Sequence, residues 1–300
     1  MSTAWSDQQE RGHPLALRAI RWIALHLGRR AARALLYPIT LYFLVRARPQ
    51  RMASRRFLTQ VLDRPAGLAQ VARHIHCFAA TILDRVYLLA GRQGLLRVEL
   101  HGEQVIRERL ATGQGFLLLG SHLGSFEILR ALGVAQERFQ LKILMQPDHN
   151  QVITAVLDAV NPRIAETVIP LGAPKTLLAV KETLDAGGVV GLLGDRAAPG
   201  EATVPCRFCG RTAHFPLGPL VLAAVTRAPV VLIFGLYRGG NRYDVYFEHF
   251  ADQLNAPRAQ RHEVLTRWVQ RYAERLDHHT RQAPYNWFNF FDFWDEPADR

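Results

Sequence analysis

Cysteine is scarce in this chain of 300 residues, and three cysteines are too few for a disulfide framework. Their number is compatible with a reducing compartment. Cys206 and Cys209 form a Cys-x-x-Cys pair, but a structural zinc site needs four ligands. Only Cys77 and His214 stand out to complete such a site, and their spacing matches no zinc motif. We therefore interpret the pair as small apolar residues in a tight turn, and we expect no metal and no cofactor.

Long hydrophobic runs are absent from the start of the chain. The longest uncharged stretch among the first 56 residues, Ala34 to Val45, has twelve residues and contains Pro38. A membrane-spanning helix needs about 20 residues. The first residues are mostly polar and arginines interrupt the apolar part, so a signal peptide does not fit. The sequence favours a segment that lies on a membrane over one that crosses it.

Acidic residues are also few in this region, where eleven arginines face only Asp7 and Glu10 and leave a net charge of +9 out of +11 for the whole chain. A pI near 10.2 would suit a nucleic-acid-binding protein. Many leucine, isoleucine and aromatic residues lie between the arginines, however, and a solvated basic arm would lack them. We expect residues 1–50 to be a basic amphipathic segment on an anionic membrane surface, with no nucleic acid as partner. An ordinary core helix rich in arginine is the alternative.

The remaining chain, residues 51–300, alternates short apolar runs with helical patterns, with a boundary expected near Arg48 and Pro49. This alternation predicts an α/β sandwich with a mixed, largely parallel sheet. A glycine-rich connection at 238–242 predicts a hairpin between the last two strands. The expected strands are 98–100, 116–119, 141–144, 168–171, 189–193, 230–237 and 243–247, and the expected helices are 103–110, 126–132, 151–160, 175–184, 217–225 and 258–281.

Motifs for nucleotide binding and for a serine nucleophile are lacking. No G-x-G-x-x-G or P-loop pattern follows Gly113 and Gly115. Ser121 and Ser125 do not lie in a G-x-S-x-G elbow. A covalent serine intermediate is therefore not indicated.

A loop of small residues carries a histidine after the apolar run 116–119. Its sequence, Gly-Ser-His-Leu-Gly-Ser-Phe-Glu, begins at Gly120 and places His122 five positions before Glu127. A carboxylate on one imidazole nitrogen would fix the tautomer and raise the basicity of the other nitrogen. We expect Glu127 to orient His122 as a general base, although a structural histidine beside an ordinary first-turn glutamate would give the same spacing.

The His-x4-Glu pattern resembles the signature of glycerolipid-type acyltransferases, and most closely the late acyltransferases of lipid A biosynthesis. The order of further motifs agrees: Gly194-Asp195-Arg196, then the block 204–210, then Pro216 to Pro219. The resemblance covers about residues 15 to 290 and makes residues 51–300 an acyltransferase domain. It implies a glycerolipid-acyltransferase-like fold and an O-acyltransferase that moves an acyl chain from a thioester to a lipid or glycolipid hydroxyl.

The predicted site follows from this resemblance. His122 and Glu127 are the expected catalytic residues. Backbone amides near Gly124 and Ser125 are the expected oxyanion donors. Arg196 is expected to meet a phosphate. The donor is acyl carrier protein or acyl-CoA, and the cytoplasmic face of the inner membrane is the expected location. The expected substrate-binding residues are Ser121, Gly124, Ser125, Gln146, Asn150, Asp195 and Arg196.

Two departures from the lipid A pattern concern charge. Gln146 holds an amide where the family commonly has an arginine, and no basic residue follows Trp287 as far as Phe293. These departures suggest a relative that acts with aryl-polyene pigments or other outer-membrane lipids. A late lipid A acyltransferase proper and a non-catalytic lipid-binding protein of the same fold are the alternatives. The aromatic segment itself could seal a sheet edge, line an acyl or polyene groove, or contact the bilayer interface.

Overall fold

A computed structural model of the chain describes residues 14–128, 140–146, 167–198 and 200–294. A sheet of seven strands forms its centre, in the order β1-β9-β8-β2-β5-β3-β4. Five neighbouring strands, from β8 to β4, run parallel, while β9 pairs antiparallel with β8. The strands of this sheet are β1 (Arg97–His101), β2 (Phe116–Gly120), β3 (Leu141–Met145), β4 (Val168–Pro170), β5 (Val189–Leu193), β8 (Val230–Gly239) and β9 (Arg242–Ala251).

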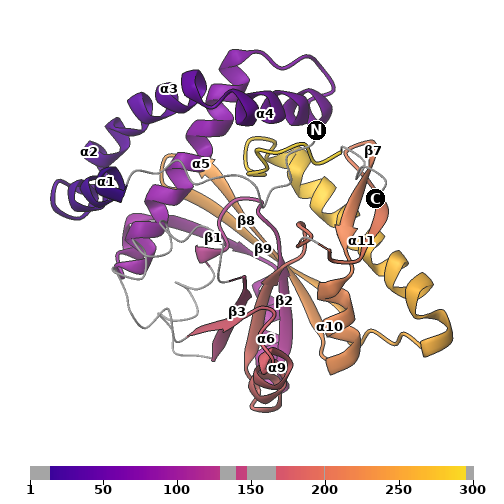
Figure 1. Cartoon of the computed structure of the whole chain (residues 1–300). Helices are drawn as coiled ribbons and strands as arrows, with labels where there is room; N and C mark the ends of the chain where they lie inside the picture. Colours follow the sequence, from indigo (N-terminus) through magenta and orange to yellow (C-terminus); the bar gives the residue numbers. More distant parts are fainter. Residues whose placement is uncertain (1–13, 129–139, 147–166, 199, 295–300) are drawn as a thin grey trace.

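Helices cover both faces of the sheet (Figure 1). The central strands are buried on both sides, so successive side chains of one strand enter two different cores. Leu117 and Leu119 of β2 lie in one core cluster, with α9, α10 and α11, and Leu118 lies in the other, with α5. The helices are α1 (Pro14–His26), α2 (Gly28–Ala34), α3 (Leu36–Arg46), α4 (Arg48–Val61), α5 (Leu68–Leu89), α6 (Glu103–Ala111), α9 (Thr176–Asp185), α10 (Gly218–Thr226) and α11 (Arg261–Gln282).

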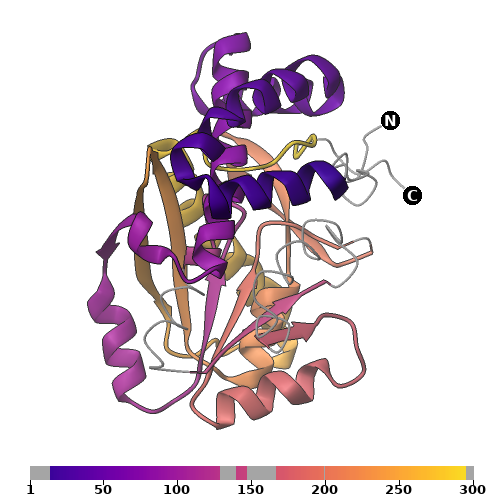
Figure 2. The same ribbon diagram turned by 90° about the vertical axis from the view of Figure 1, so that its left-hand side faces the viewer.

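The N-terminal helices gather at one end of the sheet, where Figure 2 shows them in indigo and purple close to the yellow C-terminal segment. A buried ion pair fixes α2 to α5, because Arg29 donates from Nε and Nη2 to both oxygens of Asp84, at 3.0 Å each. Tyr243 of β9 donates its hydroxyl to the same carboxylate. Helices α1 to α3 thus pack against the α/β body. Over the described part of the chain, no helix is both long and apolar enough to cross a membrane.

A two-stranded antiparallel ribbon, β6 (Thr203–Phe208) and β7 (Arg211–Pro216), stands apart from the main sheet. The sequence analysis anticipated only a tight turn in this block. The turn is present at Cys209 and Gly210, both with positive φ, but it connects two strands of six residues. Cys206 and Cys209 are buried, and burial raises the pKa of the Cys206 thiol to about 12. The arrangement is that of a hairpin with thiols packed into the core.

The predicted α/β class and the mixed, mostly parallel sheet are confirmed. Each predicted strand and the hairpin at 238–242 correspond to a strand or turn of the structure, with ends that differ by at most four residues. The predicted helix 151–160 and most of the helix 126–132 lie outside the described residues. The division at residue 50 stays a prediction: helix α4 begins at Arg48, next to the expected boundary.

Candidate active site

His122 and Asp195 follow two neighbouring strands of the sheet. Strand β2 ends at Gly120 and strand β5 ends at Leu193, and these two residues are partners in the parallel register. Parallel strands place the residues that follow them at the same edge, where α/β sheets bind ligands. The two loops therefore meet, and each brings one ionisable side chain to the meeting point.

A hydrogen bond of 2.9 Å joins Nδ1 of His122 to Oδ1 of Asp195. The backbone N–H of His122 also donates to this carboxylate, at 3.1 Å from each oxygen. Trp287, from the C-terminal segment, donates its indole N–H to Oδ2 at 2.9 Å. Asp195 has no exposed surface, whereas the His122 side chain is 33% exposed. One carboxylate thus holds both the ring and the backbone of the histidine, and the ring faces outward.

The charges around the pair favour an ionised Asp195 and a neutral His122. Burial alone would raise the pKa of Asp195, but His122, Arg196 and the Trp287 indole stabilise the carboxylate and hold its pKa at about 2. Burial and the charge of Arg196 lower the pKa of His122 below 6.5, against the opposing effect of Asp195. An ionised carboxylate only accepts hydrogen bonds, so Nδ1 carries the ring proton. The lone pair of Nε2 is then available to take a proton.

A close approach of backbones shapes the loop that carries His122. Gly124 has φ +74°, and a Cβ at this position would lie 1.9 Å from the carbonyl oxygen of Gly235 in β8. The N–H groups of Gly124 and Ser125 donate to the carbonyls of Asn286 and Gly235, at 2.8 Å each. Both amides thus hold the loop in place in this structure, where the sequence analysis expected them to be oxyanion donors.

A model of the family of bacterial lipid A biosynthesis acyltransferases matches residues 68–295, which is most of the chain. The chain belongs to this family. Among curated proteins, none matches it. The match begins at the first residue of α5 and runs to the end of the described C-terminal segment, so it includes both loops of the His122–Asp195 pair. Membership in this acyltransferase family implies an acyl donor and a lipid acceptor.

Glu127 of this acyltransferase does not make the orienting hydrogen bond that the sequence analysis assigned to it, since Asp195 makes that bond at Nδ1. The reason is topological: β2 and β5 are adjacent, and this places the Asp195 carboxylate next to Nδ1 of the ring. Glu127 is helical and mostly buried, with Oε1 4.0 Å from Nε of Arg85 on α5. Arg85 is also among the cations that lower the pKa of His122. The carboxylate of Glu127 therefore adjoins a cation that acts on the imidazole.

The predicted substrate-binding residues take different places. Asp195 is fully buried, and its carboxylate is hydrogen-bonded to His122. Ser121 and Ser125 are also buried, and Ser121 Oγ accepts the N–H of Leu123, so their burial argues against the predicted substrate contact. Gln146 is half-buried just after β3. Asn150 lies outside the described residues.

Arg196 binds the C-terminal segment. Its Nε donates to Oδ1 of Asn289 at 3.0 Å and its Nη2 to the carbonyl of Phe288 at 2.7 Å. Burial lowers the pKa of Arg196 to about 10, so the guanidinium is charged at neutral pH. Contact between this side chain and a substrate phosphate stays a prediction.

The aromatic C-terminal segment covers the ends of β2 and β5 and does not run along an edge strand. Trp287 forms a bridge with Leu123, and its ring packs against Phe57, Phe208 and Phe293 at 4.7 to 5.2 Å between centroids. The expectation that the segment seals a sheet edge is therefore wrong in place. A buried indole N–H needs an acceptor, and Asp195 supplies it.

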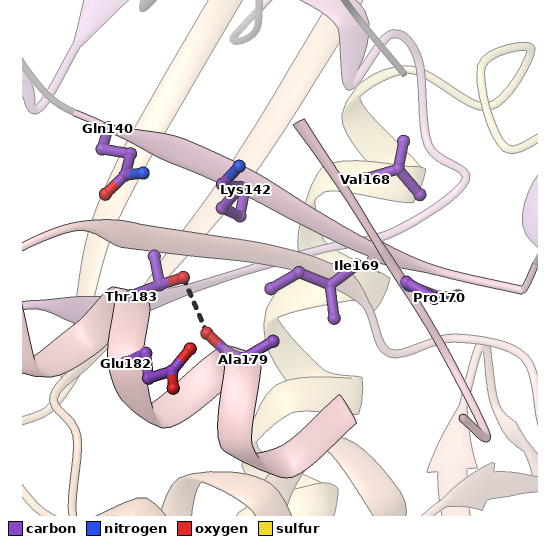
Figure 3. A pocket seen from close by; sticks show the side chains of 8 residues that line it. All are labelled: Gln140, Lys142, Val168, Ile169, Pro170, Ala179, Glu182 and Thr183. Carbon is purple, nitrogen blue, oxygen red and sulfur yellow. Dashed lines mark hydrogen bonds between the residues drawn. The ribbon is translucent and has the colours of Figure 1, made fainter. Parts of the chain in front are cut away.

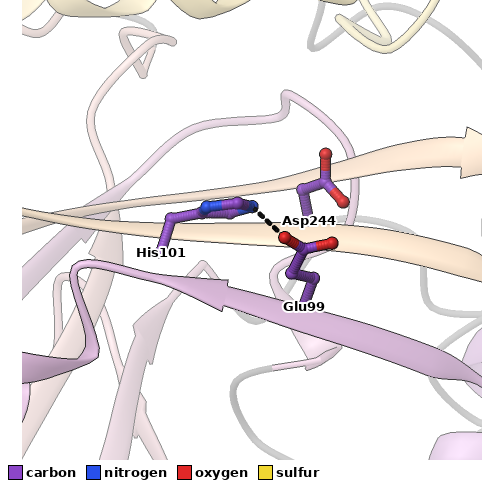
Figure 4. Close-up of side chains that lie close together, drawn as sticks. All are labelled: Glu99, His101 and Asp244. Atoms are coloured by element: carbon purple, nitrogen blue, oxygen red, sulfur yellow. Dashed lines mark ion pairs between the residues drawn. The ribbon is translucent and has the colours of Figure 1, made fainter.

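Two further features lie away from the histidine. A cavity of about 350 Å³ is lined by residues of β3, β4 and α9, among them Lys142 and Glu182 (Figure 3). At the opposite edge of the sheet, Glu99 and His101 of β1 face Asp244 of β9, with ligand atoms within 4.8 Å of one another (Figure 4). Nε of Arg238 already donates to Asp244 at 2.6 Å. This group is therefore an ion-pair cluster on a surface strand, and we infer no metal site there.

Sequence reasoning missed the roles of Asp195 and Trp287. A signal for the first was present, because the runs before His122 and Asp195 are alike: an apolar strand, then a glycine, then polar residues. Two such strands at neighbouring positions of a parallel sheet would bring their polar residues together. No local signal places Trp287 against them, since this contact joins residues 92 positions apart.

Proposed function

We propose that this protein is an O-acyltransferase that moves an acyl chain from a thioester to the hydroxyl of a lipid or glycolipid acceptor. The supporting observation is the His122–Asp195 pair: a third of the ring is exposed and Nδ1 is held by a buried, ionised carboxylate. Membership in the acyltransferase family supplies the reaction class. Lipid binding alone does not require a partly exposed imidazole whose Nδ1 is held by a buried carboxylate.

The proposed reaction begins with Nε2 of His122, which takes the proton of the acceptor hydroxyl as its oxygen attacks the thioester carbonyl. Asp195 stabilises the imidazolium that forms, since its negative charge lies 2.9 Å from Nδ1. The tetrahedral intermediate then expels the thiolate of the donor. The imidazolium returns its proton to that thiolate. A free thiol and an ester are the products, and no cofactor takes part.

Glu127 and Arg85 are proposed to set the charge beside the imidazole. Arg85 reaches this region from α5 and approaches Glu127 to 4.0 Å. The side chains of Glu127 and Arg85 are 13% and 29% exposed, so their interaction is partly shielded from water. We propose that Glu127 acts through this cation and that its loss costs less activity than the loss of His122 or Asp195.

We propose an acceptor with little negative charge, in place of a bisphosphorylated lipid A precursor. The C-terminal segment supplies Asn289 and Asp292, and these bind Arg196 and Arg56. Two arginines of this end of the molecule are thus partnered by protein groups. A bisphosphorylated acceptor would bring several charges into a partly dry site, and each unpaired charge costs several kcal/mol. An acyl chain carrier of either kind, acyl carrier protein or CoA, remains the proposed donor.

Helix α3 is the proposed membrane-facing element, on the cytoplasmic face of the inner membrane. Tyr37, Leu41 and Val45 recur every fourth residue and therefore lie on one side of the helix. Their exposed fractions are 70%, 60% and 62%, which are high for large apolar side chains. Arg46 and Arg48 follow this stripe and are also exposed. An apolar stripe beside basic residues is typical of a helix that lies on an anionic bilayer surface.

Purified protein tests the activity with donors and acceptors of defined structure. Acyl carrier protein thioesters and acyl-CoA are each mixed with a panel of hydroxylated lipids, and mass spectrometry detects the ester while a thiol reagent follows the release of the carrier. We expect ester and thiol in equal amounts. Thiol release without any acylated lipid would indicate a thioesterase, and neither product with any pair would contradict the proposal.

Vesicle binding tests the membrane surface. The triple variant Tyr37→Ser, Leu41→Ser, Val45→Ser should bind vesicles that contain anionic lipid at least tenfold more weakly, because three large apolar side chains are lost. The control is Leu177→Ser with Leu178→Ser on α9, where both leucines are also about half exposed. Equal losses in the two variants would contradict a role of α3. Deleting residues 1–50 is a poorer test, because Arg29 and Leu36 belong to the packed body.

A further inference from the structure

Three consecutive residues of the C-terminal segment attach to the loop that carries His122. The N–H of Gly124 donates to the carbonyl of Asn286 at 2.8 Å, and the N–H of Phe288 donates to the carbonyl of His122 at 3.1 Å. Between these bonds, Trp287 bridges Leu123 and turns its fully buried indole toward Asp195. The backbone of this segment thus holds the histidine loop, and the Trp287 indole contacts the carboxylate that binds the histidine.

We propose that Trp287 is a positioning residue for the His122–Asp195 pair and that His74 of α5 holds Trp287 in its place. The proposal rests on the proposed function, since the pair is positioned for a base only if His122 acts as one. Nothing in the position of Trp287 brings it to a substrate. It acts through Asp195.

The carboxylate of Asp195 has two oxygens with separate tasks. Oδ1 binds Nδ1 of His122, and Oδ2 binds the indole of Trp287, at 2.9 Å each. With both oxygens held, rotation of the carboxyl group about its own bond would break two charge-assisted hydrogen bonds at once. Without the indole, the remaining donor to Oδ2 among the described residues is the shared backbone N–H of His122. The Asp195 carboxylate would stay next to Nδ1 of His122, but its orientation and that of the ring would be less fixed.

His74 anchors the other side of Trp287. It is fully buried, its Nε2 lies 2.9 Å from the carbonyl of Trp287, and its Nδ1 lies 2.8 Å from the hydroxyl of Ser54 on α4. A carbonyl only accepts, so Nε2 carries the proton and Nδ1 accepts the Ser54 hydroxyl. Burial lowers the pKa of His74 to about 4, which keeps this ring neutral and the tautomer constant through the working pH range. A continuous set of hydrogen bonds thus runs from α4 through α5 and Trp287 to His122.

The electrostatic effect of Trp287 on His122 has a defined sign. The positive end of the indole N–H dipole faces Oδ2 and partly offsets the negative charge of Asp195. That negative charge raises the pKa of His122. Removing the indole N–H should therefore raise the pKa of His122. Other groups facing the ring are Asp195 and Arg196 after β5 and Arg85 on α5, and they stay unchanged in this comparison.

The variant Trp287→Phe tests the proposal, and Trp294→Phe is its matched control. Both remove one indole N–H from the same aromatic cluster, where the two rings lie 6.2 Å apart. Trp294 donates to the carbonyl of Phe208 at 3.4 Å and does not contact Asp195. We expect Trp287→Phe to lower kcat by about 10- to 100-fold with KM within twofold. The pKa of His122, followed by NMR of its ring protons, should rise. Trp294→Phe should leave kcat, KM and this pKa at wild-type values.

Equal values of kcat and of the His122 pKa in the two variants would overturn the proposal. If Trp287→Phe does not fold, the wild-type protein decides: the indole N–H resonance of Trp287 should titrate with His122, and that of Trp294 should not. A Trp287 indole resonance that does not shift as His122 titrates would also overturn the proposal. Both NMR measurements use protein without substrate, so they give an answer even if no acyl transfer is found and the proposed function fails.

Discussion

Oδ1 of Asp195 lies 2.9 Å from Nδ1 of His122, although the two residues are 73 positions apart in the chain. The contact exists because β2 and β5 are neighbours and end at the same level of the sheet. This contact places an ionised carboxylate at Nδ1 of a partly exposed imidazole. The same arrangement orients the general base in other acyl-transfer sites.

The pH dependence of kcat/KM should report His122. Its pKa lies below 6.5, and the base form is active, so activity should rise with pH through that pKa and reach a plateau at neutral pH. Asp195 raises this pKa and Arg196 lowers it. The acid limb should therefore move to lower pH in Asp195→Asn and to higher pH in Arg196→Gln. Limbs that move in one direction in both variants would contradict these charge effects.

Asp195 and Glu127 should differ in their weight for catalysis. Asp195→Asn should lower kcat by about 10²- to 10⁴-fold, because the amide does not stabilise an imidazolium and can favour the wrong tautomer. Glu127→Gln should lower kcat much less, by about tenfold, since Glu127 adjoins Arg85 and does not hold Nδ1. Thermal unfolding of both variants serves as the control. A larger loss of kcat in Glu127→Gln than in Asp195→Asn would show that Glu127, and not Asp195, orients His122.

Gly124→Ala should destabilise the histidine loop by more than the cost of placing alanine at a positive φ, because the added Cβ also meets a backbone carbonyl. The added Cβ would lie 1.9 Å from the Gly235 carbonyl oxygen, in a residue with φ +74°. Gly172→Ala is the matched control, because Gly172 has φ +83° with open space around it. The control should lose about 1 kcal/mol of stability and keep its activity. Gly124→Ala should lose at least 2 kcal/mol, measured by urea unfolding, and most of its activity. Similar stability losses in the two variants would refute the close-contact argument.

The charge of the acceptor gives a further prediction. At equal acyl donor, kcat/KM should be higher for a neutral or singly charged hydroxylated lipid than for a bisphosphorylated lipid A precursor. The physical reason is that Asn289 and Asp292 bind Arg196 and Arg56, so these cations are already engaged by the protein. Asn289→Lys should narrow the difference between the two acceptors. Efficient acylation of the bisphosphorylated lipid by wild-type protein would show that other cations meet its charges.

Local patterns predicted most of the fold but only part of the site. Apolar runs such as 116–119 and 189–193 are consistent with buried strands, and their length of four or five residues favours a strand over a helix. The ribbon β6–β7 was missed because the whole Cys-x-x-Cys block was interpreted as a turn, although buried and exposed residues alternate along β6. His122 was predicted from its small neighbours, which leave room around the ring. Glu127 was predicted as its partner because a contact five positions away is visible in a sequence, whereas the hydrogen bond at Nδ1 comes from Asp195.

Asp195 and Trp287 needed the strand order and the course of the C-terminal segment. Both are set by packing between residues far apart in the chain, and no local propensity encodes them. The backbone hydrogen bonds of the predicted oxyanion donors could not be foreseen for the same reason. Whether the amides of Gly124 and Ser125 are available depends on where β8 and the C-terminal segment pass, and both of them supply carbonyls to these amides.

Single-turnover acyl transfer by His122→Ala tests the central claim most directly. The variant should unfold at nearly the wild-type temperature, because the ring is a third exposed and contributes little packing. With the acyl thioester and acceptor that serve the wild-type enzyme best, formation of the ester should slow by about 10²- to 10⁴-fold, the usual contribution of a general base. A folded His122→Ala enzyme that forms the ester at the wild-type rate would contradict the account.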